Sequence, residues 1–221
     1  MKVLPKREIK ASCEQLLAIF IILSGLALTG CRQSAASNPE QRGRQLFAAC
    51  APCHGSAGEG RKDVGAPAIA GLHSWYIEVE VNQFRTGIRG AHFDDPGGLR
   101  MRPMVKAFRD EDVKLVAGFV SSLPAVKQAP AMNGDPKAGR DVYENCAVCH
   151  GENAEGIEDI KSAPMSTFEE WYLAEQLQKF KKGIRGYHPD DAQGTMMKSA
   201  AEELTDQQIR DVVAYIRSLQ K

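Results

Sequence analysis

The sequence lacks an excess of charge of either sign, a long apolar run and any strand-like alternation of apolar and polar residues. Its 221 residues include 28 basic and 28 acidic side chains and are 43% hydrophobic, which excludes a highly charged disordered protein and a collagen-like repeat. Its charge-free apolar stretch, residues 16–30, is only fifteen residues long, which excludes a many-span membrane protein. The absence of alternation predicts an all-α fold.

The first thirty residues have the pattern of an export signal. Four basic and two acidic side chains precede the apolar stretch, which ends at Leu28-Thr29-Gly30-Cys31. These last residues resemble the lipobox of bacterial lipoproteins, which implies cleavage before Cys31 and acylation of its thiol. We therefore expect residues 1–30 to be a signal peptide and residues 31–38 a lipid-anchored tether on the periplasmic side of a bacterial membrane. An uncleaved helical anchor and plain secretion are the alternatives, since a membrane span usually needs about 20 apolar residues.

The mature chain also lacks a spare pair of cysteines. Cys13 leaves with the signal peptide and Cys31 carries the lipid, so four cysteines remain: Cys50, Cys53, Cys146 and Cys149. If these four serve another purpose, no disulfide can form even in an oxidising compartment.

An internal repeat organises the rest of the chain. Residues 40–125 align with 136–221 at a constant offset of 96 without a gap, and 26 of the 86 aligned positions are identical. We name these the first and second repeat. They predict one domain over residues 39–123 and another over 135–221. Residues 124–134, rich in Pro and Ala and without a helical stripe, predict a linker.

Each repeat shows three helical patterns. The first begins at Asn38-Pro39 or Asp135-Pro136, a capping residue followed by a proline suited to the first turn. The second covers about residues 74–86 or 169–182. The last has apolar residues spaced i, i+3, i+4, i+7 from Val113 or Ile209, with Thr205 as the expected cap of the second copy. We expect little regular structure in the long stretches between them, residues 55–73 and 87–109.

Cys-x-x-Cys-His occurs once in each repeat, at residues 50–54 and 146–150. This is the attachment signature of c-type haem. Two thiols three positions apart lie on one side of a helical turn, where they can bond to two vinyl groups of one porphyrin edge, and the adjacent histidine can ligate the iron. A thioredoxin-like dithiol, which would need a βαβ surrounding, and half of a zinc site are the competing interpretations.

With these motifs, residues 40–221 resemble a diheme class I cytochrome c of the cytochrome c4 kind. The resemblance implies two small domains of three to five helices, each around one covalent haem c, with His54 and His150 as axial ligands and methionine opposite. It also implies electron transfer from a membrane-bound donor complex to a terminal oxidase or reductase. The Gly-Ile-Arg-Gly-x-His stretches at 87–92 and 183–188 further resemble cytochrome modules attached to haem-copper oxidases.

Two pairs of residues recur as candidates for the sixth iron ligand. Met101 and Met197 match at the repeat offset and lie nine residues before the last helix, where the resemblance places the ligand methionine. His92 and His188 also match and are the alternative. The neighbouring methionines Met104 and Met196 do not recur. The choice matters because a methionine ligand raises the reduction potential of a haem relative to a second histidine.

Other residues are expected around the haems. The resemblance makes the Pro67 carbonyl the hydrogen-bond acceptor of His54, whereas the proline of the second repeat, Pro164, is displaced by one position and leaves the acceptor of His150 open. Haem propionates are expected to contact four side chains, the alternative being that these are surface arginines and packing tryptophans: Arg89, Arg185, Trp75 and Trp171. The pairs 94–95 and 190–191, all aspartates, are expected to be solvated loop residues.

Size and charge add two expectations. A domain of about 90 residues with three helices buries a modest core, so we expect haem to supply part of the interior and each repeat to fold only in part without it.

The two halves of the mature chain differ in charge. Residues 40–127 carry 12 basic and 10 acidic side chains, whereas residues 128–221 carry 11 basic and 16 acidic side chains. This difference, net +2 against net −5, can orient encounters with a redox protein partner.

The sequence therefore predicts a membrane-tethered diheme electron carrier that is not an enzyme and binds neither nucleic acid nor a small-molecule substrate. A diheme peroxidase or thiosulfate-oxidising enzyme is the first alternative, and it requires one haem with an open or labile position. A fixed cytochrome subunit of an oxidase or dehydrogenase is the second.

Overall fold

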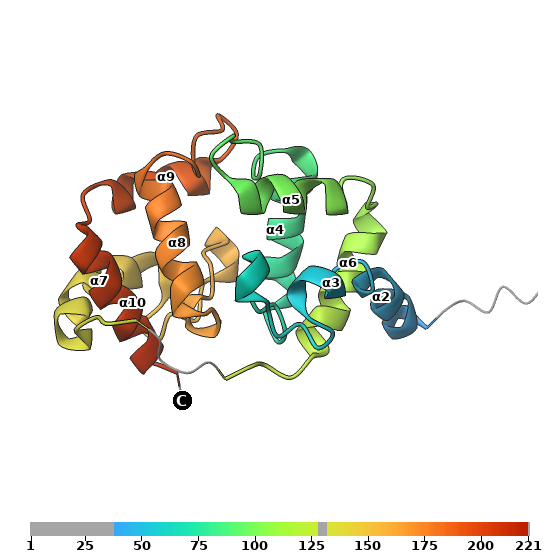
Figure 1. Ribbon diagram of the computed structural model, residues 1–221, viewed down its shortest axis with the longest axis horizontal. Helices are drawn as coiled ribbons and strands as arrows, with labels where there is room; N and C mark the ends of the chain where they lie inside the picture. Colours follow the sequence, from blue (N-terminus) through green and yellow to red (C-terminus); the bar gives the residue numbers. More distant parts are fainter. Residues whose placement is uncertain (1–37, 128–131, 221) are drawn as a thin grey trace, which may run out of the picture. The chain divides into compact units, whose positions relative to one another are not determined.

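The computed structural model describes residues 38–127 and 132–220, and all regular elements in these ranges are helical (Figure 1). The all-α prediction is thereby confirmed. Each repeat adds one isolated β-bridge at an equivalent place, Arg61 with Ala66 and Ile157 with Ser162. The expected signal peptide, Cys31, nearly all of the tether and linker residues 128–131 lie outside the described residues. Within those residues, no helix is long and apolar enough to cross a membrane.

Both repeats belong to one compact unit, Asn38–Lys221. The helices of the first repeat are α2 (Pro39–Phe47), α3 (Ala51–His54), α4 (Ser74–Thr86), α5 (Pro96–Val105) and α6 (Asp110–Ser122). Those of the second are α7 (Pro136–His150), α8 (Glu170–Lys181), α9 (Ala192–Glu202) and α10 (Asp206–Ser218). Short 3₁₀ turns lie at Lys62–Val64, Glu158–Ile160 and Met165–Thr167.

The helix starts follow the predicted capping residues. Asn38 accepts a hydrogen bond from the backbone of Glu40, and Asp135 accepts one from Lys137. Thr205 accepts one from the N–H of Gln208 at 3.1 Å. These side chains satisfy backbone donors that the first turn of a helix leaves without a partner.

The expectation of little regular structure between residues 87 and 109 is wrong. Helix α5 occupies much of this stretch, and α9 occupies the equivalent stretch of the second repeat. Helix α5 contains two glycines and two prolines, which are unfavourable in helices, so the sequence pattern does not predict it. Each helix starts because an aspartate caps it: Asp95 accepts from Gly98 N–H at 3.0 Å, and Asp191 accepts from Gly194 N–H at 2.8 Å.

The two repeats differ in the helix that carries the Cys-x-x-Cys-His motif. In the second repeat α7 continues to His150, whereas in the first α2 ends at Phe47 and α3 starts at Ala51. Pro52 stands where the second repeat has Val148. Proline has no N–H for the carbonyl four residues earlier, and its ring clashes with that carbonyl. The helix is interrupted, and the motif restarts as a separate turn.

The first and last helices of each repeat pack closely, α2 against α6 and α7 against α10 (Figure 1). A glycine lies at each crossing. A Cβ atom at Gly43 would lie 2.7 Å from Cβ of Phe119, and one at Gly139 would clash with the backbone carbonyl of Asp211. Backbone contact at these crossings therefore requires the absence of a side chain.

We expect Gly139→Ala to lower the free energy of unfolding by about 1 to 3 kcal/mol, the usual effect of overpacking an interior. Gly118→Ala in α6 is the matched control, because a Cβ there meets no atom within 4 Å. This control should be about 0.5 to 1 kcal/mol more stable than the native chain, since alanine favours a helix over glycine. Chemical unfolding of the haem-loaded proteins measures both values, and equal effects would contradict close packing at Gly139.

Candidate haem sites

Cys146 and Cys149 lie near the end of α7, whereas Cys50 directly precedes the short helix α3 and Cys53 lies within it. In each pair the first thiol, of Cys50 or Cys146, is half-buried and the second, of Cys53 or Cys149, is exposed, and none of the four is in a disulfide. The motif helix ends directly after its histidine, at a glycine with φ of 85° in the first repeat and 82° in the second. The backbone leaves the helix there in a conformation that favours glycine.

His54 is buried and oriented by the backbone. Its Nδ1 lies 2.8 Å from the carbonyl oxygen of Pro67, the acceptor that the resemblance implies. Because a carbonyl only accepts, Nδ1 carries the hydrogen. Burial also lowers the pKa of His54, which favours the neutral ring with a free lone pair on Nε2. This is the form in which a histidine ligates a metal.

His150 repeats this arrangement with a different residue as acceptor. Its Nδ1 donates to the carbonyl of Ala163 at 2.9 Å, and burial lowers its pKa as well. Ala163 is the counterpart of Pro67 at the offset of 96. The acceptor of His150, which the displaced Pro164 left open, is therefore the residue at the position equivalent to Pro67, although that residue is not a proline.

The free side of His150 faces a methionine. The Nε2 atom of His150 and the sulfur of Met197, on α9, are 3.4 Å apart. An imidazole nitrogen and a thioether sulfur are the pair of atoms that ligates iron in many cytochromes c, and here the two face one another. The neighbouring Met196 is 63% exposed. The geometry favours Met197 as the sixth ligand, and its ligation stays a prediction.

In the first repeat, Met101 on α5 is half-buried and packs against the hydrophobic core. It lines an apolar cavity together with Cys50, Cys53 and His54, and Met104 lies at the same cavity while being 48% exposed. The cavity wall also includes core residues of several helices: Leu72, Tyr76, Ile77, Val81, Phe84, Val105, Val116 and Val120. A thiol pair, a histidine and a thioether around an apolar space fit a covalently attached haem.

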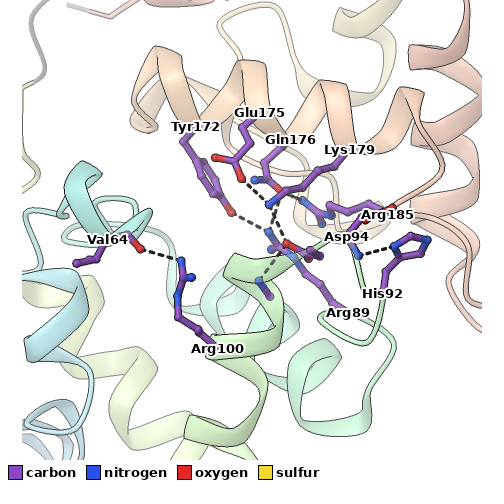
Figure 2. Close-up of polar contacts among 12 residues, drawn as sticks. Val64, Arg89, His92, Asp94, Arg100, Tyr172, Glu175, Gln176, Lys179 and Arg185 are labelled. Carbon is purple, nitrogen blue, oxygen red and sulfur yellow. Dashed lines mark hydrogen bonds and ion pairs between the residues drawn. The ribbon is translucent and has the colours of Figure 1, made fainter.

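The alternative histidine ligands have loop contacts. Nδ1 of His92 accepts a hydrogen bond from Asp94 N–H at 3.1 Å (Figure 2), and Nδ1 of His188 accepts one from Asp190 N–H at 3.2 Å. His92 also stacks on the exposed ring of Phe93. These contacts hold the two imidazoles in the loops ahead of α5 and α9, and nothing similar to the His150–Met197 approach involves them within the described residues.

Arg89 lies at the wall of the cavity and contacts both repeats. Its guanidinium donates to Tyr172 and Gln176 of α8 (Figure 2), each at 2.9 Å. It also forms an ion pair with Glu80. Its Nε is buried without a hydrogen-bond partner. A free donor at a haem cavity fits the expected propionate contact, which stays a prediction.

Arg185 shares these partners. It donates to Gln176 at 2.9 Å and lies 3.6 Å from Glu80. Burial, together with the nearby charge of Arg89, lowers the pKa of Arg185 to about 10. One buried and one half-buried guanidinium group around one carboxylate leave an excess of positive charge, which a haem carboxylate would compensate.

The two tryptophans lie near aromatic neighbours. Trp75 is half-buried and stacks on His73 with the rings 6.1 Å apart, and Trp171 meets the ring of Tyr172 edge-on. Trp171 also hydrogen-bonds to the carboxylate of Glu169. These are packing and polar contacts within the protein, and a role at the propionates stays a prediction.

The prediction that all four aspartates are solvated loop residues is correct for the first member of each pair and wrong for the second. Asp94 and Asp190 are exposed, but Asp95 and Asp191 are buried helix caps. Asp95 also forms an ion pair with Lys179 of the second repeat at 2.8 Å. Burial beside glycine N–H groups makes these residues structural.

Sequence reasoning missed the residues that join the two repeats: Glu80, Glu169, Gln176 and Lys179. Their contacts cross between segments about one hundred residues apart. The repeat comparison could not find them, because at these positions the repeats differ: Glu80 aligns with Gln176, His73 with Glu169 and Gln83 with Lys179.

The chain is similar in sequence to known proteins. The cytochrome c family matches residues 40–124 and again 136–220. The chain is 28% identical to cytochrome c4 of Azotobacter vinelandii over 91% of its length and 98% of that protein. It is 26% identical to the thiosulfate dehydrogenase electron acceptor of Stutzerimonas stutzeri (strain A1501), over 77% of its length and 79% of that protein. It is 30% identical to subunit CcoP of a cbb3-type cytochrome c oxidase from Rhodobacter capsulatus, over 77% of its length and 58% of that subunit.

Two family matches, each containing one complete Cys-x-x-Cys-His motif, indicate two covalently bound haem c groups, one attached to Cys50 and Cys53 and one to Cys146 and Cys149. This excludes the dithiol and zinc interpretations of the motifs. The chain belongs to the cytochrome c family and is a diheme electron-transfer cytochrome.

Proposed function

We propose that the protein is a membrane-tethered carrier with histidine and methionine ligands at both haems. It takes electrons from a membrane-bound donor complex and delivers them to a terminal oxidase or reductase. The observation that carries the proposal is the 3.4 Å approach of Met197 sulfur to His150 Nε2. A haem iron ligated by both side chains would have no open position for a substrate and would be suited to exchange of electrons alone.

The protein's own residues then have distinct roles. The four cysteines attach the two haems, each of which supplies one-electron oxidation and reduction when bound. Hydrogen bonds to Pro67 and Ala163 fix the orientation of His54 and His150. The thioether sulfurs of Met101 and Met197 would complete the ligand sets and raise the reduction potentials. In the first repeat, the apolar cavity wall would limit water around the iron, which would also favour the reduced state.

Relatives support a role between two larger redox partners. One relative is named for accepting electrons from thiosulfate dehydrogenase, and another is a subunit of a cbb3-type oxidase. By similarity, a dehydrogenase is a fitting donor and an oxidase a fitting acceptor. The acidic residues 128–221, with their net charge of −5, are suited to a basic surface on one partner.

Binding of external ligands tests the carrier against the enzyme alternatives. A carrier with two filled axial positions should not bind carbon monoxide when reduced, or should bind it only slowly and weakly. A peroxidase or a thiosulfate-oxidising enzyme should bind it rapidly at one haem. Stopped-flow spectroscopy of the purified diheme protein measures this, and a fast, tight reaction would overturn the proposal.

Membrane attachment is expected to depend on Cys31. In a bacterial host, the native protein should fractionate with membranes, and Cys31→Ser should lose acylation and appear in the soluble periplasmic fraction or as uncleaved precursor. Cys13→Ser, inside the predicted signal peptide, is the control and should leave attachment unchanged. Mass spectrometry of the mature N-terminus checks cleavage and acylation. A Cys31→Ser protein processed normally yet still membrane-bound would contradict the lipid anchor.

A further inference from the structure

The peptide group that joins Pro67 to Ala68 lies between His54 and a carboxylate of the other repeat. Its carbonyl oxygen accepts from Nδ1 of His54 at 2.8 Å. Its N–H donates to both carboxylate oxygens of Glu169, at 3.0 and 3.1 Å. One peptide unit thus connects the imidazole of the first repeat to an acidic side chain 101 residues away.

Glu169 is held closely in this position. It is only 7% exposed and directly precedes α8. Gly60 makes room for it, because a Cβ there would lie 2.8 Å from Glu169 Oε1 and would also clash with the N–H of Ala68. Burial raises the pKa of Glu169, and the hydrogen bonds from Ala68 and Trp171 counteract this effect.

The second repeat has no equivalent connection. The acceptor of His150 is the carbonyl of Ala163, and the peptide nitrogen that follows belongs to Pro164, which has no hydrogen to donate. At the position equivalent to Glu169, the first repeat has His73, which is exposed and stacks on Trp75. The second repeat therefore lacks the peptide N–H, and the first repeat offers it no matching carboxylate, although the hydrogen bond from histidine to a backbone carbonyl is the same in both repeats.

We propose that Glu169 is a positioning residue that acts through the Pro67–Ala68 peptide to make His54 a stronger electron donor to its iron than His150 is. A carboxylate that accepts from a peptide N–H polarises the peptide and makes its carbonyl a better acceptor. A stronger hydrogen bond at Nδ1 raises the basicity of a ligating histidine. A more basic ligand stabilises the oxidised iron, so Glu169 lowers the reduction potential of the first haem and leaves the second unaffected. The inference rests on the proposed ligation by His54.

Glu169→Gln tests the role of the charge with little change of shape. The measurement is a redox titration at pH 8, which favours the ionised carboxylate in the native protein, with each haem followed by its own NMR signals. We expect the substitution to shift the equilibrium between the oxidised and reduced first haem about tenfold toward the reduced form. For a one-electron couple this is a rise of about 59 mV. The second haem should keep its potential. Glu59→Gln is the control, because it removes one carboxylate charge from an exposed position in the loop that contains Gly60.

The double variant Pro67→Ala/Ala68→Pro tests the route. It gives the first repeat the Ala-Pro pair that the second repeat already has at 163–164, so the carbonyl can still accept from His54 while the N–H is lost. We expect the first haem to shift in the same direction as in Glu169→Gln. Adding Glu169→Gln to the double variant should then change the potential little, because the two changes remove one connection.

The outcomes separate this inference from the proposed ligation. If the native first haem lacks a low-spin, six-coordinate spectrum, the ligation by His54 and Met101 fails. If that spectrum is present and unchanged in Glu169→Gln but the potential of the first haem does not move, the role of Glu169 is wrong. A shift of both haems, or an equal shift in Glu59→Gln, would show a general charge effect and would also overturn the inference.

Discussion

Met197→Ala is expected to change the second haem from low-spin to high-spin in its oxidised form and to abolish its far-red sulfur-to-iron absorption band. Met197 holds its sulfur 3.4 Å from the free nitrogen of His150, and alanine puts no donor there. The reduction potential of the second haem should fall by a few tenths of a volt, within the roughly 0.8 V over which axial ligands set haem potentials. Absorption and electron paramagnetic resonance spectra with redox titration measure these changes.

Met196→Ala is a closely matched control, because Met196 is the adjacent residue on α9 and is 63% exposed. It should leave the spectrum and both potentials unchanged. Met101→Ala, compared with Met104→Ala, repeats the experiment on the first haem. If His188→Ala rather than Met197→Ala altered the second haem, the bis-histidine alternative would be right and the methionine assignment wrong.

The helices that carry a strong local signal could be predicted from the sequence. Asn38, Asp135 and Thr205 are capping residues by type and position, and the apolar stripe of the last helix needs only its own neighbours to be recognised. Helix α5 was missed because Pro96, two glycines and Pro103 are unfavourable for a helix in isolation. Its cap, Asp95, is stabilised by Lys179 from the other repeat, a contact that no local pattern contains.

At the haem sites too, local patterns could be predicted from the sequence and contacts between the repeats could not. The attachment motif is local, so Cys50, Cys53 and His54 could be named from spacing alone. The repeat offset then singled out Met101 and Met197 among seven methionines. The offset could not reveal Glu169, since a comparison of repeats detects what they share and this carboxylate acts where they differ. Contacts between the repeats, such as Arg89 with Gln176, depend on how the two domains pack.

A chain without attached haem is expected to lose cooperative folding in both repeats. In the first, Tyr76, Phe84, Val116 and Val120 line the cavity and also belong to the hydrophobic core, so a chain without haem would lack the apolar contacts that the macrocycle adds to these side chains. Small domains are stable by only about 5 to 15 kcal/mol, and burial contributes about 25 cal/mol per Å² of apolar surface. Losing the contacts of a large macrocycle removes an amount comparable with the whole stability.

A chain with serine at all four motif cysteines, purified free of haem, tests this expectation. Its circular dichroism should show reduced helicity and a broad, non-cooperative thermal transition, and amide exchange in α4 and α6 should be fast. Cys50→Ser/Cys53→Ser alone, also freed of the first haem, is the internal control: α7 and α10 pack on each other within the second repeat and should stay protected. A sharp transition near the melting temperature of the native protein would mean that the helices sustain the core without haem. The contacts of Lys179 with Asp95 and of Glu169 with Ala68 would then have to stabilise the first repeat from outside.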